Sequence, residues 1–212
     1  MPNDANAAFE PSALAEREAL ITGKPPRLPP MSADEMGPDA MELIRDIRRA
    51  VGLDPDAMKE VPDYMSTILR HTDLYRRFGE YGVQLLKGVI SPRHRELAIL
   101  RTGWLCRAPF EWGEHVAIGQ RCGLTAEEIE RVTRGSSDPA WNADERAILR
   151  AVEELHRDAM ISDETWAELA KVLDQKQLIE LPFLIGHYHA VAFYQNAIRL
   201  RPPPGNLGLS SR

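Results

Sequence analysis

Helix-start signals followed by apolar residues at helical spacing recur along this chain, and they constrain its fold more than any other feature. Thr125 with Glu128, and Asp174 with Gln177, have the spacing of a capping box, in which two side chains satisfy free N–H groups at a helix start. Sustained alternation of apolar and polar residues, which would indicate a strand, does not occur, and no hairpin dipeptide separates two apolar runs. The sequence therefore predicts an all-α protein.

Two helices joined by a short corner are expected at the centre of the chain. Ser91 followed by Pro92 predicts a helix start, and the next predicted start is at Pro109, with Gly123 closing that second helix. The remaining expected helices cover residues 39–51, 61–71, 73–87, 125–134, 142–160, 163–173 and 174–200.

The chain is long enough for one well-buried core, and we expect a single domain between two irregular ends. Residues 1–38 of the 212-residue sequence hold seven prolines and predict an extended arm, with a short helix near residues 12–22. The arm is expected to lie on the body or to reach a neighbouring subunit. Residues 39–200 form the predicted helical domain, and residues 201–212 a flexible or docked tail.

The central helix pair holds the residues most typical of acid/base chemistry. Glu111 and His115 are four positions apart and share one helix face, and the corner can bring Glu96 of the preceding helix close to them. A carboxylate beside an imidazole orients the ring and raises its affinity for a proton. On spacing alone, a histidine that is merely packed or solvated remains the alternative.

A family resemblance strengthens this interpretation. Glu96, then His115 nineteen positions later, a helix break between them, and GLTAEEI after them resemble the signature of the carboxymuconolactone decarboxylase and AhpD alkylhydroperoxidase superfamily. The AhpD branch carries a CxxC pair, but Ala108 and Glu111 occupy those positions here. Without a thiol pair, the thiol/disulfide cycle of that branch is disfavoured. The segment FEWGEH resembles the decarboxylase branch more closely.

The resemblance implies an AhpD-like helical bundle that assembles as a dimer, trimer or hexamer. It also implies a lyase or isomerase that uses no cofactor, acts on a small carboxylated or lactone substrate, and belongs to aromatic-compound catabolism. His115, with a pKa near neutral, is the expected proton donor, Glu111 its orienting or relay partner, and Glu96 a more distant supporting carboxylate. Two alternatives are an AhpD-type alkylhydroperoxidase and a non-catalytic helical oligomer that serves as a binding module.

Four further residues are predicted to contact the substrate. Arg101, inside an apolar helix, can hold a carboxylate in a bidentate grip, although a buried ion pair with Glu96 or Glu111 is an equal alternative. The other three candidates are Trp112, Tyr75 and His187, with a plain core role as the alternative for Tyr75.

The last predicted helix, QLIELPFLIGHYHAVAFYQNAIRL, is too apolar for a surface helix and is expected to be central or at a subunit contact. His187 and His189 point about 160° apart on an ideal helix, so only one of them can face the cavity of His115. The other is expected to meet the arm, a subunit or water, and His156 is expected on the surface.

Charge and cysteine content limit the partners. The net charge of −6, without a long basic run, argues against nucleic-acid and membrane binding. Cys106 and Cys122 do not indicate a disulfide framework, and with no secretory signal we expect a cytoplasmic protein. We predict no metal: a site combining His115, Glu111 and one of the C-terminal histidines has suitable ligand types, but no spacing fixes it.

Overall fold

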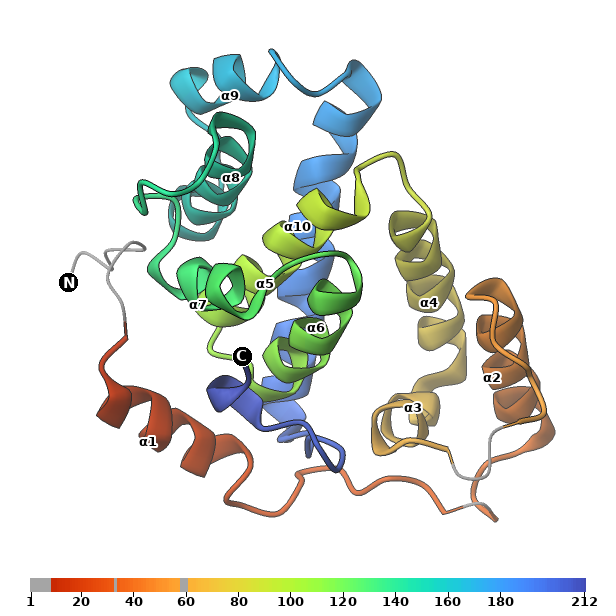
Figure 1. Ribbon diagram of the computed structural model, residues 1–212. Helices are drawn as coiled ribbons and strands as arrows, with labels where there is room; N and C mark the ends of the chain where they lie inside the picture. Colours follow the sequence, from red (N-terminus) through yellow and green to blue (C-terminus); the bar gives the residue numbers. More distant parts are fainter. Residues whose placement is uncertain (1–8, 33, 58–60) are drawn as a thin grey trace.

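The computed structural model describes residues 9–32, 34–57 and 61–212, and every regular element in these ranges is a helix (Figure 1). The prediction of an all-α fold is confirmed for this part of the chain, whereas residues 1–8 of the predicted arm lie outside it. The helices are α1 (Pro11–Ile21), α2 (Pro38–Ala50), α3 (Asp63–Ile68), η1 (Leu69–His71), α4 (Thr72–Leu86), α5 (Pro92–Leu105), α6 (Pro109–Arg121), α7 (Ala126–Arg134), α8 (Ala143–Asp158), α9 (Asp163–Leu169), α10 (Gln175–Ile198) and η2 (Gly208–Ser210).

Helix α5 is the centre of the molecule, and every residue from Glu96 to Leu105 is buried. Its start is fixed by the hydroxyl of Ser91, which accepts a hydrogen bond from the backbone N–H of His94 at 3.2 Å. Because its sequence is apolar nearly all round, it can pack on α6, α8 and α10 at once. Figure 1 shows α2, α3 and α4 on one side of this centre and α7, α8 and α9 on the other.

A tight corner turns the chain from α5 into α6. Arg107 adopts a left-handed backbone conformation with φ 45°, and the N–H of Ala108 donates to the carbonyl of Gly103 at 3.0 Å. Pro109 then starts α6, where its missing N–H leaves no unsatisfied donor. The corner aligns the first turns of α6 beside α5, which positions the predicted acid/base residues.

Both ends of the described chain pack on the helical body. A carboxylate oxygen of Glu18 in α1 accepts from the backbone N–H of Leu209 at 2.6 Å. After α1, the backbone N–H of Arg27 donates to the carbonyl of Ile198 at 2.9 Å. The carbonyl of Ser211 accepts from the indole of Trp112 at 3.0 Å. The described part of the arm and the tail therefore both contact the helical body, and a contact of the arm with a neighbouring subunit stays a prediction. None of the described helices combines the length and apolarity needed to cross a bilayer.

Candidate active site

The imidazole of His115 is held between two carboxylates. Its Nδ1 lies 2.7 Å from Oε2 of Glu96 on α5, and its Nε2 lies 3.1 Å from Oε1 of Glu111, one turn earlier on α6. The residue as a whole is 7% exposed. Both ring nitrogens therefore have an anionic partner, and the predicted proximity of these three residues is present in the structure.

Each carboxylate is held in turn by a second side chain. The guanidinium Nε of Arg95 donates to Oε1 of Glu96 at 3.0 Å, and the side-chain amide of Gln195 on α10 donates to Oε2 of Glu111 at 2.7 Å. Because both oxygens of each carboxylate are engaged, the two acids present fixed faces to the ring.

The carboxylates keep the ring protonated. Burial opposes a charge on the imidazole, but the charge of Glu111 and the hydrogen bonds that the ring donates to Glu111 and Glu96 outweigh it and raise the pKa of His115 to about 10. Burial also opposes the charge on Glu96, yet His115 and Arg95 hold the pKa of this carboxyl below its usual value. The near-neutral pKa expected for His115 is therefore corrected, because two acids contact the ring instead of one.

A cavity of about 750 Å³ opens beside this ring. His115 and Glu111 form part of its wall, while the guanidinium-bearing Arg201 and the following prolines border it from the C-terminal tail. Most of the remaining wall is aromatic or aliphatic. It includes Tyr64, Tyr75, Phe78, Phe110, Tyr188 and Val191.

Five predicted site residues lie at or beside this cavity. His115, Glu111, Tyr75 and His187 line it. Glu96 does not line the cavity: it is fully buried behind the ring and contacts it directly, in agreement with its expected supporting position.

Arg101 and Trp112 do not line the cavity, and their assignment as substrate contacts is corrected. Arg101 is 1% exposed; its Nε donates to Glu153 of α8 at 2.9 Å, and another of its nitrogens donates to the carbonyl of Val132 at 2.9 Å. A buried ion pair was the stated alternative, but its partner is neither Glu96 nor Glu111. Trp112 is fully buried and donates to the tail.

The three histidines of α8 and α10 divide between two places. His187 stacks on Phe78 with ring centroids 4.4 Å apart, and its buried Nδ1 has no hydrogen-bond partner among the described residues. His189 lies on another face of α10, as the helical spacing predicts. Within the chain its ring contacts His156, at 2.9 Å, and the expected contact with the arm, a subunit or water stays a prediction. His156 is half-buried, which corrects its expected surface position.

Sequence reasoning missed Gln195 and Arg201. Gln195 follows Tyr188 and Val191 at helical spacing, and this signal alone would have placed it on their face of α10. For Arg201, which lies beyond the last helix, no periodic signal exists.

Comparisons with known proteins agree on the family region and the fold. Residues 71–154 match the carboxymuconolactone decarboxylase family. The structure is similar to an uncharacterised peroxidase-related protein with an alkylhydroperoxidase AhpD core from Ralstonia eutropha JMP134, with 16% identity over 85% of this chain and 94% of that chain and a TM-score of 0.71. A peroxidase-related protein from Silicibacter sp. TM1040 has 13% identity over 87% and 95% of the two chains, with a TM-score of 0.70.

The debrominase Bmp8 is also similar in structure, with 16% identity over 84% of this chain and 92% of that chain and a TM-score of 0.63. At such identities the likeness concerns the fold. No curated protein matches the sequence.

Proposed function

We propose that this protein, which matches the carboxymuconolactone decarboxylase family over residues 71–154 and has an AhpD-like fold, is an acid/base enzyme acting without a cofactor on a small carboxylated or lactone substrate. The observation that carries the proposal is the imidazole of His115, held between Glu96 and Glu111 at the wall of an apolar cavity.

In this proposal His115 is the proton donor. Loss of CO2 from a lactone acid leaves an electron pair delocalised as an enolate-like anion, and the reaction ends when a proton reaches carbon. The Nε2 proton, now shared with Glu111, supplies it directly or through that carboxyl, and the neutral ring then takes a proton from solvent. An isomerisation would use the same donor after removal of a proton from carbon.

Arg201 replaces Arg101 as the proposed carboxylate ligand. Among the described residues that line the cavity, Arg201 is the arginine. A guanidinium at the rim can hold a carboxylate while the aromatic walls enclose the ring of the substrate. An alanine variant of the debrominase Bmp8 is known in complex with 2,3,4-tribromopyrrole, which supports a small ring-shaped ligand for this fold.

A thiol-based alkylhydroperoxidase is less well supported. Ala108 and Glu111 stand where the resemblance requires the thiol pair, and Glu111 instead bonds the ring of His115. Burial raises the pKa of the nearby Cys106 thiol to about 12, which removes the thiolate that attacks a peroxide.

The test is turnover of a panel of carboxylated lactones, including carboxymuconolactone, followed by CO2 release and by product analysis. We expect His115→Asn to lower kcat by about 10²–10⁴-fold, as is typical when a positioned acid is removed.

Arg201→Gln should raise KM with little change in kcat, whereas Arg121→Gln, an exposed arginine of α6 away from the cavity, should change neither. The rate should be flat through neutral pH and fall above about pH 10.

Two results would contradict the proposal. No turnover of any lactone acid would refute the substrate class, and full activity of a folded His115→Asn protein would refute the role of the imidazole. In the second case, the helix pair would be scaffolding.

A further inference from the structure

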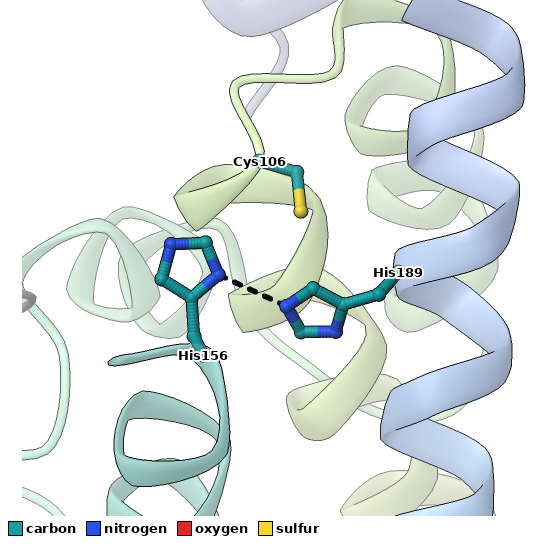
Figure 2. Close-up of side chains that lie close together, drawn as sticks. All are labelled: Cys106, His156 and His189. Carbon is teal, nitrogen blue, oxygen red and sulfur yellow. Dashed lines mark hydrogen bonds between the residues drawn. The ribbon is translucent and has the colours of Figure 1, made fainter. Parts of the chain in front are cut away.

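Three potential metal ligands converge away from the cavity. Cys106 at the end of α5, His156 of α8 and His189 of α10 each point one ligand atom into a common space, and these atoms lie within 4.8 Å of one another (Figure 2). None of the three lines the cavity of His115. They are 50 and 33 positions apart in the sequence, so no local sequence motif predicts the cluster.

The hydrogen bonds of His189 present a nitrogen lone pair to this space. Its Nδ1 lies 2.9 Å from the carbonyl oxygen of Ile185, which can only accept, so Nδ1 carries the ring proton. Nε2 is therefore unprotonated in the neutral ring and points at Nδ1 of His156, 2.9 Å away. A backbone carbonyl that fixes the tautomer in this way is the usual support of a metal-binding histidine.

We propose that Cys106, His156 and His189 bind one Zn²⁺ ion through Sγ, Nδ1 and Nε2, respectively, with water as the fourth ligand. One thiolate and two imidazoles are the donors that Zn²⁺ prefers, and a group without carboxylates or carbonyls does not suit Mg²⁺ or Ca²⁺. The half-buried position of both histidines leaves room for the water ligand.

The distances require only a small adjustment. With Zn–N bonds of about 2.0–2.1 Å and a Zn–S bond of about 2.3 Å, tetrahedral angles place the two nitrogens about 3.4 Å apart and the sulfur about 3.6 Å from each. The two nitrogens are 2.9 Å apart and must separate by about half an ångström. The sulfur lies within 4.8 Å of each nitrogen and must come to about 3.6 Å from both.

Proton release accompanies binding. The thiol of Cys106 loses its proton to solvent, and His156 moves the proton of Nδ1 to its Nε2, so that both ring nitrogens facing the ion are free. Burial lowers the pKa of both histidines and keeps them in the neutral form that binds metal. Two cations lie nearby, Arg17 and Arg101, and the second is balanced by its ion pair with Glu153.

Binding would join three helices that are distant in sequence. Such a cluster stabilises the folded chain, because the unfolded chain does not hold the three ligands together. Because none of the three ligands lines the cavity, the ion would act on the fold and not on the substrate.

Co²⁺ provides a spectroscopic test on the full chain. We expect one equivalent to bind with the near-ultraviolet absorption of a thiolate–Co²⁺ bond, and Zn²⁺ to displace it. Cys106→Ser should abolish this absorption, and His156→Gln or His189→Gln should weaken binding by more than about 100-fold, since loss of a mere supporting partner already costs 10–100-fold. Cys122→Ser is the matched control and should bind as the wild type does.

The thiolate band separates this cluster from the carboxylates around His115, which would bind Co²⁺ without it. Circular dichroism shows which variants remain folded, and the two histidine variants test the site independently of the cysteine. Absence of stoichiometric binding with a thiolate band, or equal loss in Cys122→Ser, would overturn the proposal.

Discussion

At the level of single residues, the protonation of His115 depends on two acids that approach it from opposite sides of the ring. A histidine with one carboxylate titrates closer to neutrality, as in many catalytic pairs. Here the second carboxylate, Glu96, is fully buried, so water cannot replace the ring of His115 as its hydrogen-bond partner. The imidazolium therefore contributes to the stability of the fold as well as to the proposed chemistry.

This arrangement predicts a pH dependence of stability. The folded-state pKa of His115, about 10, lies above the value of about 6.5 in an unfolded chain, so its contribution is complete below about pH 6.5 and is lost as the pH rises through about 10. Thermal unfolding should show stability falling over that window by at most about 1.4 kcal/mol per pH unit. The lowered pKa of Glu96 adds a second loss as the pH falls below about 4.

His115→Gln should flatten the alkaline fall, whereas His71→Gln, at an exposed histidine, should leave it unchanged. Parallel curves for the wild type and His115→Gln would show that the ring is not charged in the folded protein.

The sequence predicted those site residues whose contacts are local. Glu111 and His115 are one helical turn apart, and a single corner separates them from Glu96, so helix geometry and one proline sufficed. The partner of Arg101 is 52 positions away, on α8, and the partner of Trp112 is in the tail. Helical periodicity states which face a residue occupies but not which distant element covers that face.

At the level of elements, α6 presents a different surface to each neighbour. One face carries His115 and Glu111, and another receives the tail, where Asn206 bonds the carbonyl of Phe110 at 3.0 Å and Glu114 at 3.0 Å. Gly113 makes this contact with the tail feasible, because a Cβ there would lie 1.8 Å from Oδ1 of Asn206.

Gly113→Ala should therefore destabilise the protein although alanine favours helix. We expect a loss of about 1–3 kcal/mol from overpacking, measured by chemical denaturation. Gly103→Ala in α5 is the control: its Cβ would meet the backbone of Trp112 at 3.6 Å, an ordinary contact, so stability should stay the same or rise by up to about 1 kcal/mol. A gain in stability for Gly113→Ala would mean that the tail is not seated there in solution.

At the level of the whole molecule, α10 carries an exposed stripe that suits a second copy of the chain. The stripe consists of Ile179, Phe183, Gly186, Ala190, Phe193 and Ala197, all exposed and spaced by alternating steps of four and three. The positions are symmetric about residue 188, so two antiparallel copies would pair Phe183 with Phe193 and Gly186 with Ala190. The homo-oligomer expected from the sequence stays a prediction, and this stripe is our choice for its contact.

Ala190→Glu should dissociate that oligomer, because it places two like charges near a two-fold axis. Light scattering coupled to gel filtration should show the mass fall to that of a smaller assembly or a monomer. Ala117→Glu, at an exposed alanine of α6, should leave the mass unchanged. A monomeric wild type, or the same mass for both variants, would exclude this contact.

The cavity is built from residues inside and outside the segment that matches the family. His115 and its partners Glu96 and Glu111 lie within residues 71–154, which match the family, whereas Gln195, Arg201 and the prolines after it lie outside that segment. The imidazole with its two acids and the C-terminal border of the cavity therefore come from separate stretches of this chain. Substitutions among residues 201–204 can therefore reshape this border without touching the imidazole of His115, Glu96 or Glu111.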